Sequence, residues 1–247
     1  MTRASDRLYE RQVATLVASW RAYARHSDGA RVEDVEGAAV CLFPSAPESA
    51  VYNNALLPRG LGGARAREVV AAVDGAYREA GIPSYAIWAH ESESDAVAAL
   101  EDRDLRFDSA TRAMAMSLDA LAVPRPEIEL GDLDWDGYAE LEGIPGLLRG
   151  ASAAEFHLRV ARLDGRDVGA VIAYDHEGDR GIFNLGTVPE ARRRGVGTAL
   201  TALQLHEARE RGCTTASLQS TPIAEGVYAA LGFANLGRYL EYVPAIG

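Results

Sequence analysis

Apolar residues recur every three to four positions along the first 25 residues of the chain. With this spacing Leu8, Val13, Leu16, Val17 and Trp20 fall on one helical face, which predicts an amphipathic helix over residues 5–25. The pattern then changes to short apolar or alternating runs between Gly, Pro and Ser residues, which is typical of strands joined by turns. In order, the pattern predicts strands over 37–43 and 51–57, a helix over 64–80, a strand over 84–90, a helix over 94–103 and a strand over 110–118.

A linker follows. Residues 123–132 contain two prolines and have neither a helical nor a strand period, so we place a linker at 123–131. Beyond it, Asp164-Gly165 separates two apolar runs and predicts a β-hairpin. The elements predicted after the linker are hairpin arms within 157–165 and 166–178, a strand over 181–188, a helix over 195–211, a strand over 214–220, a helix over 223–231 and a strand over 234–243.

The order strand, strand, helix, strand, helix, strand thus occurs twice. Pro58 and Gly81 bracket the first helix of this order at the separation at which Pro189 and Gly212 bracket the second, an offset of 131. Two related copies are expected to keep the Pro and Gly residues that bound their helices at one constant offset. We therefore interpret the chain as a diverged duplication. The alternative is that two unrelated α/β units have the same spacing of Pro and Gly by chance. At the same offset Asn53 falls on Asn184, whereas Leu105-Arg106-Phe107 matches Leu231-Gly232-Phe233 at a slightly smaller one.

Composition narrows the class of protein. The chain has 247 residues, 48% of them hydrophobic, and a formal net charge of -11, which disfavours non-specific attraction to nucleic acid or to an anionic membrane. Cys41 and Cys213 are far apart and lack metal-ligand spacing, so we expect neither a disulfide framework nor a metal site. The first 20 residues are too charged for a signal peptide, and no apolar run is long enough to span a bilayer. We therefore expect a cytoplasmic protein.

The segment "VPEARRRGVGTAL", residues 188–200, is a local positive spot on this acidic chain. It places three arginines and two glycines between a predicted strand and a predicted helix. Free amide N–H groups at a helix N-terminus and the helix dipole attract anions, glycine lets the backbone approach a phosphate, and arginine adds forked donors. A dinucleotide fingerprint needs Gly or Ala where Leu200 stands, and a P-loop needs Gly-Lys-Ser or Gly-Lys-Thr, so both nucleotide interpretations weaken.

The pattern Arg192-x-x-Gly195-x-Gly197, after the strand "FNLGTVP" and at the start of a helix, resembles the GCN5-related N-acetyltransferase (GNAT) family, in which this segment wraps the pyrophosphate of acetyl-CoA. The segment "LQSTPIAEGVYAALGF", residues 218–233, is similar to the fifth strand and following helix of that family. The resemblance covers nearly all of residues 155–243. It implies an α/β fold with a mixed α+β sheet, the acyl-CoA N-acyltransferase fold, in two tandem copies: a degenerate GNAT-like domain at 1–122, the linker at 123–131 and an acetyltransferase domain with the acetyl-CoA site at 132–247.

The resemblance also assigns residues. Gly186 in mid-strand fits a bulge, and by resemblance the strand splays around 185–188, so that its amides pair with the pantetheine arm and polarise the thioester carbonyl. Tyr228 matches the tyrosine that acts as general acid toward the departing thiolate. The implied acetyl-CoA contacts are Leu185, Thr187, Val188, Arg192, Arg193, Arg194, Gly195, Val196, Gly197 and Thr198, with no metal.

The first copy lacks this signature at the offset of 131. Arg192, Gly195 and Gly197 then fall on Leu61, Ala64 and Ala66. A shifted register places Arg59-Gly60-Leu61-Gly62 at the glycine-containing part of the motif, but Leu57 then stands at the position of Arg192. At the smaller offset Tyr228 falls on Asp102. We therefore expect a structural partner rather than a second catalyst.

Two parts of the chemistry stay open. For the general base the sequence offers Glu142, His157, Asp175, His176 and Glu225, or a water relay, whereas His206 is expected to pack or to face solvent. Asn53, Trp88, Tyr138 and Asn184 are candidates to line an acceptor cleft between the copies, although Trp88 also fits a core position.

The leading hypothesis is an N-acetyltransferase that moves the acetyl group of acetyl-CoA to a primary amine of a small molecule by direct attack. The alternatives are a non-catalytic acyl-CoA-binding or regulatory module, and acetylation of a protein N-terminus or lysine. The expected partners are acetyl-CoA and the amine acceptor, with no nucleic acid and no membrane, and a homodimer is left open.

Overall fold

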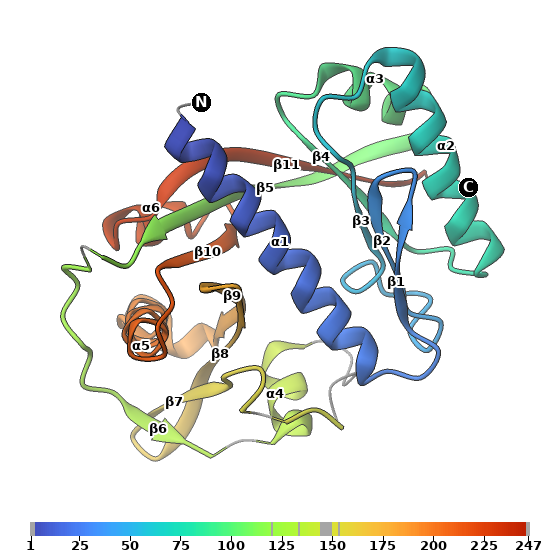
Figure 1. Ribbon diagram of the computed structural model, residues 1–247. Helices are drawn as coiled ribbons and strands as arrows, with labels where there is room; N and C mark the ends of the chain where they lie inside the picture. Colours follow the sequence, from blue (N-terminus) through green and yellow to red (C-terminus); the bar gives the residue numbers. More distant parts are fainter. Residues whose placement is uncertain (1–2, 120, 133, 144–149, 153, 246–247) are drawn as a thin grey trace. The chain divides into compact units, whose positions relative to one another are not determined.

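A computed structural model describes residues 3–119, 121–132, 134–143, 150–152 and 154–245 (Figure 1). The chain divides into two compact units, each made of more than one chain segment. We call Trp20–Arg112 with Gly237–Gly247 the first unit, and Met1–Ser19 with Ala113–Leu236 the second unit. Both units combine helices with a mixed sheet, which confirms the predicted fold class. The predicted boundaries at 1–122, 123–131 and 132–247 refer to two duplicated copies and not to compact units. They therefore stay a prediction.

The elements follow the chain in a regular order. The helices are α1 (Arg3–Arg25), α2 (Gly63–Glu79), α3 (Ser94–Glu101), α4 (Trp135–Glu142), α5 (Val196–Glu210) and α6 (Glu225–Ala230), with a short 3-10 turn η1 (Pro189–Ala191). The strands are β1 (Arg31–Val35), β2 (Ala38–Leu42), β3 (Asn54–Leu56), β4 (Ala86–His90), β5 (Leu105–Ser117), β6 (Glu129–Gly131), β7 (Arg159–Leu163), β8 (Arg166–His176), β9 (Asp179–Thr187), β10 (Thr215–Ser220) and β11 (Ala234–Pro244). Among the described residues, no helix is both long and apolar enough to cross a membrane.

The first unit has the strand order β1-β2-β3-β4-β11-β5, to which β5 and β11 contribute the residues that belong to this unit. Strands β3 and β4 are parallel, whereas β11 runs antiparallel to β4. Helix α2 packs on β1 and β2 through Val69, Val70, Val73 and Tyr77, which its periodicity places on one face and which are all fully buried. Each such side chain contributes roughly 1.5–3 kcal/mol by burial, so this face holds α2 on the sheet.

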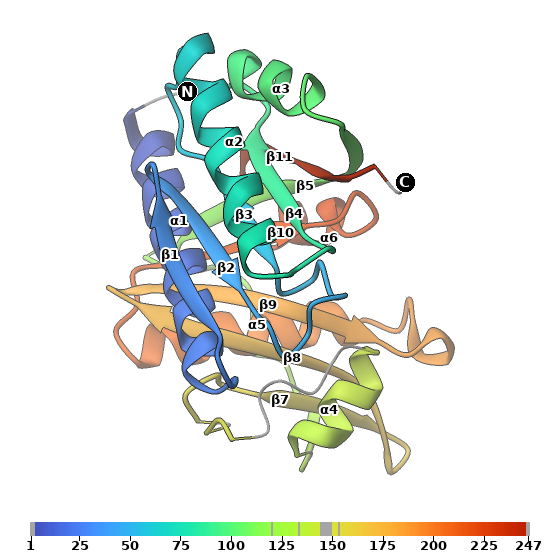
Figure 2. The same cartoon turned by 90° about the vertical axis from the view of Figure 1, so that its right-hand side faces the viewer.

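The second unit has the strand order β5-β10-β9-β8-β7-β6. The predicted hairpin is confirmed: β7 and β8 are antiparallel, and Asp164 and Gly165 turn the chain with φ of 52° and 73°. Strands β9 and β10 are parallel, as β3 and β4 are in the first unit. Helices α4 and α5 both contact β8 and β9, and they lie on opposite faces of this part of the sheet (Figures 1 and 2). Side chains that alternate along β9 therefore point to α4 and to α5 in turn.

Three elements were missed. Strand β1 precedes the first predicted strand and pairs with β2 across a turn at Glu36 and Gly37. Helix α4 lies between the predicted linker and hairpin. The predicted linker is partly wrong, because its residues 129–131 form β6, which pairs with β7. A three-residue strand is too short to show a period, so pairing with a neighbour rather than local pattern decides it.

The register of the duplication needs a correction. Gly81 and Gly212 follow α2 and α5 at the offset of 131, and both have a positive φ. At the other end, however, the N-cap residues are Gly62 and Gly195, which are 133 apart. Helix α2 has 17 residues and α5 has 15, so the two junctions align two residues away from the predicted register. Arg59 and Gly62, rather than Leu61 and Ala64, correspond to Arg192 and Gly195.

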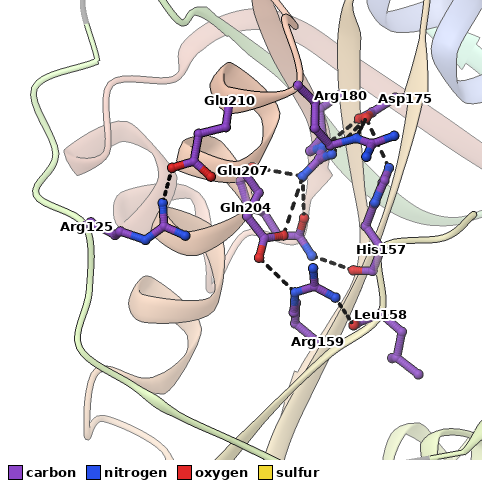
Figure 3. Close-up of polar contacts among 10 residues, drawn as sticks. Arg125, His157, Leu158, Arg159, Asp175, Arg180, Gln204, Glu207 and Glu210 are labelled. Atoms are coloured by element: carbon purple, nitrogen blue, oxygen red, sulfur yellow. Dashed lines mark hydrogen bonds and ion pairs between the residues drawn. The ribbon is translucent and has the colours of Figure 1, made fainter. Parts of the chain in front are cut away.

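A buried arginine ties α5 to the sheet of the second unit (Figure 3). Arg180, on β9, has no exposed surface and bonds to both carboxylate oxygens of Asp175 at 2.6 and 2.8 Å. Its Nη1 also donates to the backbone and side-chain oxygens of Gln204 on α5. Gln204 in turn donates to the His157 carbonyl, and His157 Nε2 lies 3.0 Å from Asp175. Burial alone would raise the pKa of Asp175, but the bonds from Arg180 and His157 outweigh it and hold that pKa well below its usual range.

We expect Arg180→Met to lower the free energy of unfolding by roughly 3 kcal/mol, because it leaves the Asp175 carboxylate without its main counter-charge. Arg125→Met is the matched control: Arg125 pairs with Glu210, but both side chains are about half exposed, so its loss should cost under about 1 kcal/mol. Urea unfolding of the two variants and the wild type measures both values. Equal effects would show that Arg180 does not hold the second unit together.

Candidate active site

Strands β9 and β10 run side by side and then separate. Their parallel pairing extends from Asp179 opposite Thr215 to Ile182 opposite Leu218, and it ends there although both strands continue. After Ile182, the edge of β9 that faced β10 is therefore no longer paired with that strand. Backbone N–H and C=O groups on such an edge are free to pair with an extended ligand.

A bulge lies on β9 beyond Ile182. Ala170 of β8 is opposite Gly186, and Ile172 is opposite Phe183, so β9 carries one extra residue between these pairs. Asn184 in this stretch has a left-handed φ of 45°. The bulge was predicted around Gly186. On the opposite strand, a Cβ at Gly169 would lie 2.8 Å from the Gly186 carbonyl oxygen, so only glycine lets the two strands come this close.

The carboxylate of Glu142 sits against this bulge. Asp134 caps α4 by accepting a hydrogen bond from the Gly137 N–H at 2.8 Å, and Gly143 ends the helix in a left-handed conformation. Glu142 is the last residue of α4, and its carboxylate accepts a hydrogen bond from the Gly186 N–H. A Cβ at Gly186 would lie 2.2 Å from Glu142 Oε1, so the glycine makes room for the carboxylate.

This carboxyl group has an unusual proton affinity. Burial raises the pKa of Glu142 to about 7, and the bond from the Gly186 N–H offsets only part of that rise. Oε1 is buried and has no hydrogen-bond partner among the residues that the structure describes. A carboxylate that is half ionised near pH 7 and has one unused oxygen is suited to take up a proton.

The arginine–glycine segment joins β9 to α5 through η1. Arg193 and Gly195 both have a positive φ, of 61° and 81°, and Gly195 is the N-cap of α5 with no side chain capping the helix. A Cβ at Gly195 would meet nothing within 4 Å, so the space over the helix start is open. The first N–H groups of α5 are thus available to an anion, as the sequence predicted.

The three arginines are exposed around this helix start. Arg192 folds back, and its Nε donates to the Thr187 carbonyl at the end of β9. Arg194 lies 3.9 Å from Asp164, which is itself 89% exposed, so this pair leaves the guanidinium free to exchange partners. The residues of this segment therefore fit a diphosphate group in donor type and in exposure.

Tyr228 is the fourth residue of the short helix α6 and is buried, with 8% of its surface exposed. It packs edge-to-face on Phe233, with ring centroids 5.9 Å apart, and it belongs to the hydrophobic core cluster that includes Leu200 of α5 and Leu218 of β10. Burial raises the pKa of Tyr228 to about 12. The phenol therefore stays protonated across the physiological range, as a proton donor must.

The other predicted bases lie away from the bulge or remain open. Asp175 and His176 lie at the far end of the β8–β9 hairpin, where Asp175 pairs with Arg180, six residues and about 20 Å along β9 from Gly186. His157 precedes β7, and its side chain contacts Asp175 at that end. Glu225 begins α6 and stays an open candidate. His206, as predicted, has a packing role, with its Nε2 2.9 Å from the Val123 carbonyl.

The predicted acceptor residues separate into two groups. Asn53 is a fully buried structural amide: it accepts from the Phe43 N–H and donates to two carbonyls of the same loop, so the expectation that it lines a cleft is wrong. Trp88 is half-buried between the rings of Trp20 and Tyr239 in the first unit. By contrast, Asn184 is exposed at the bulge, and Tyr138 lies one helical turn before Glu142 on α4.

Comparison with known protein families identifies the segment that carries this geometry. Residues 154–235, which include β9, α5, β10 and Tyr228, match the acetyltransferase (GNAT) domain family. These residues form a GNAT acetyltransferase domain. The chain therefore carries an acyltransferase of the GNAT type, whose family uses acetyl-CoA. No curated protein sequence matches the chain.

Solved structures share the fold over most of the chain. A GCN5-related N-acetyltransferase from Kribbella flavida superposes with a TM-score of 0.70 at 17% identity and covers 95% of this chain and 96% of its own. One from Sphaerobacter thermophilus has a TM-score of 0.65 at 17% identity, with 94% and 90% covered. A tandem GNAT protein from the clavulanic acid biosynthesis pathway has a TM-score of 0.58 at 16% identity, with 83% and 77% covered. At these identities the similarity shows the fold, including its extension beyond the GNAT domain.

Helix α4 precedes the matched GNAT segment and was the part of the site that sequence reasoning missed. A signal was present, because Asp134 is a good N-cap, Trp135 and Tyr138 are spaced as one helical face, and Gly143 is a helix stop. The eight-residue helix gave too short a period to stand out. The role of Glu142 also depends on β9, 44 residues later in the chain, which no local pattern reveals.

Glu142→Gln should stabilise the protein at high pH. The folded-state pKa is raised, so the stabilising contribution of the protonated carboxyl is full below pH 4.5 and is lost as the pH rises through about 7. Glutamine resembles the protonated form at every pH. The variant should match the wild type near pH 4.5 and exceed it by about 2 to 3 kcal/mol at pH 8 in urea unfolding. Glu140→Gln, on the exposed side of α4, is the control and should leave the pH dependence unchanged.

Proposed function

We propose that this protein transfers the acetyl group of acetyl-CoA to a primary amine of a small molecule by direct attack. The observation that carries the proposal is the Glu142 carboxylate, which lies at the β9 bulge with a pKa of about 7 and one unpaired oxygen. An amine that is protonated in solution must lose a proton before it can attack a carbonyl. The Glu142 carboxylate supplies that function, and it bonds to the bulge at the Gly186 N–H.

The acetyl-CoA site follows from the junction at α5. Arg193, Arg194 and the N–H groups of residues 195–198 would hold the diphosphate, while Leu185, Thr187 and Val188 would line the arm that runs along β9. When bound, acetyl-CoA supplies an acetyl group activated as a thioester. The free edge of β9 would orient its carbonyl with N–H donors, which favours the oxyanion that develops on attack.

The protons balance with two side chains of this chain. Glu142 Oε1 takes a proton from the acceptor ammonium, the nitrogen forms the new amide bond, and the carbon–sulfur bond breaks. The Tyr228 hydroxyl gives its proton to the departing sulfur. The second proton, which the nitrogen loses as it becomes an amide, passes through solvent to the Tyr228 oxygen and restores the hydroxyl. With a phenol pKa of about 12 against roughly 8.5 for a thiol, this transfer costs about 5 kcal/mol at reference values. Tyr228 is therefore effective only if the proton moves as the sulfur leaves, when the sulfur is most basic.

The acceptor should be cationic before it reacts. Glu142 offers it a negative partner, Asn184 is exposed at the bulge, and the chain as a whole carries a net charge of -11. These features suit an ammonium group better than a neutral or acidic acceptor. The chain contains no lysine, so acetylation of its own side-chain amines cannot be mistaken for turnover.

Glu142→Gln should lower kcat by roughly 100- to 10,000-fold and leave acetyl-CoA binding intact, because glutamine keeps the shape but cannot take the proton. The measurement is release of the CoA thiol with a panel of small primary amines. In the wild type, kcat/KM should rise with pH through an apparent pKa near 7, and this step should be absent from the variant's residual activity. Unchanged turnover in Glu142→Gln, with Glu140→Gln as the reference, would remove Glu142 from the mechanism.

Tyr228→Phe and Arg194→Ala should have different effects. Tyr228→Phe removes a proton donor and should reduce kcat at least about tenfold while acetyl-CoA still binds. Arg194→Ala removes a phosphate donor and should raise KM for acetyl-CoA about tenfold with little change in kcat. Arg209→Ala, at the far end of α5, controls for the loss of charge.

A protein that binds acetyl-CoA with normal affinity but releases no thiol above hydrolysis with any amine would contradict the enzymatic proposal. It would favour a non-catalytic acyl-CoA-binding module instead. Acetylation of peptides in preference to small amines would transfer the proposal to a protein N-terminus or lysine.

A further inference from the structure

The junction before α2 in the first unit resembles the junction before α5 in part, because both helices begin after a glycine N-cap. The two caps differ in conformation: Gly62 is extended (φ -74°, ψ 158°), whereas Gly195 is left-handed (φ 81°, ψ 3°). Gly62 and Gly195 are the N-caps, and their carbonyls accept the first helical bonds, from Ala66 at 2.8 Å and from Ala199 at 2.9 Å. Two residues before each N-cap the chain turns through a positive φ, 79° at Gly60 and 61° at Arg193. In this register Arg59-Gly60-Leu61-Gly62-Gly63-Ala64 corresponds to Arg192-Arg193-Arg194-Gly195-Val196-Gly197. The first unit therefore retains a glycine N-cap, a positive-φ residue two positions before it and an arginine at Arg59.

A carboxylate of the chain itself lies in this first junction. Glu93 Oε2 accepts a hydrogen bond from the Gly60 N–H at 2.6 Å, and Oε1 accepts from Arg59 Nε at 3.3 Å and from the Ser92 hydroxyl at 2.8 Å. Only 13% of the Glu93 side chain is exposed. Burial alone would raise the pKa of Glu93, but the bonds from Gly60, Ser92 and Arg59 outweigh it and lower that pKa. Glu93 therefore stays ionised and uses the donors that an outside anion would need.

The second unit has an alanine at the matching place. Glu93 is the N-cap of α3, the helix that follows β4, and the residue at the N-cap of α6, the helix that follows β10, is Ala224. Among the described residues, Arg192 donates to the Thr187 carbonyl and Arg194 lies 3.9 Å from the exposed Asp164. The first junction thus has a carboxylate, Glu93, where the second unit has Ala224, and it lacks the two arginines, Arg193 and Arg194, that the second junction has.

We propose that Glu93 is an internal anion that closes the loop–helix junction of the first unit to phosphate-containing ligands. The donors of this junction, the Gly60 N–H and the Arg59 guanidinium, are then already occupied by a carboxylate of the chain itself. A phosphate could enter only by displacing Glu93 from Gly60, Ser92 and Arg59. One consequence rests on the proposed function: each chain would then have a single acyl-CoA site, in the second unit. The role of Glu93 itself does not depend on it.

The test is titration of inorganic pyrophosphate into the full-length protein, followed by calorimetry and by the shift in melting temperature. Glu93→Ala should gain one pyrophosphate site per chain relative to the wild type, with an affinity at least about tenfold above any that the wild type shows at this junction. Adding Arg59→Ala to this variant should remove the gain. Glu91→Ala is the matched control, because the Glu91 carboxylate bonds to the Arg238 N–H and not to Gly60, and it should gain no site.

A folded Glu93→Ala variant with the wild-type stoichiometry would overturn the proposal, and so would a wild type that already binds pyrophosphate at the Arg59 junction. Glu93→Gln, nearly the same shape without the charge, provides the same comparison if Glu93→Ala does not fold. The result is read as an increment over the wild type. A failure of the proposed acetyl-CoA site would appear separately, as a wild type that binds no acetyl-CoA.

Discussion

The ionic contact between Arg180 and Asp175 fixes the geometry on which the second unit depends. Arg180 stands on the part of β9 that is paired with β10, opposite Ala216, and reaches Gln204 in the middle of α5. Apolar packing has no direction and would let a helix slide or rotate by small amounts, whereas these hydrogen bonds specify one position. Because α5 is rigid, fixing its middle also fixes its start at Gly195. The open stretch of β9 and the helix start are thereby held in one frame.

Burial raises the pKa of two side chains, Glu142 and Tyr228, but one would act in its ionised form and the other in its protonated form. Burial raises the pKa of Glu142 to about 7 and that of Tyr228 to about 12. Near pH 7 the carboxyl is ionised often enough to accept a proton, whereas the phenol is protonated and can give one. One physical effect, loss of solvation, therefore separates an acid from a base because the two groups start from different reference values.

Much of the fold could be predicted from the sequence because its signals are local. Asp164-Gly165 sets a hairpin, Pro189 and Gly212 bracket α5, and the segment at 192–197 marks a helix start. The errors have a different origin. Strand β6 exists because β7 lies beside it, and the correct register of the first junction depends on where α2 begins rather than on where it ends. Glu142 and Glu93 gain their roles from residues 44 and 33 positions away in the chain, and contacts at such separations leave no local pattern.

The division of β11 between the two units has a consequence for synthesis. Residues 239–242, near the end of the chain, pair with β4 and complete the sheet of the first unit, whose main segment ends at Arg112. A ribosome that adds about 5–20 residues each second needs on the order of 10 s to reach them after Arg112. During that interval the edge of β4 has no β11 beside it. The half of the protein that is made first is thus the half that is finished last, and its nascent sheet must wait for the remainder of the chain.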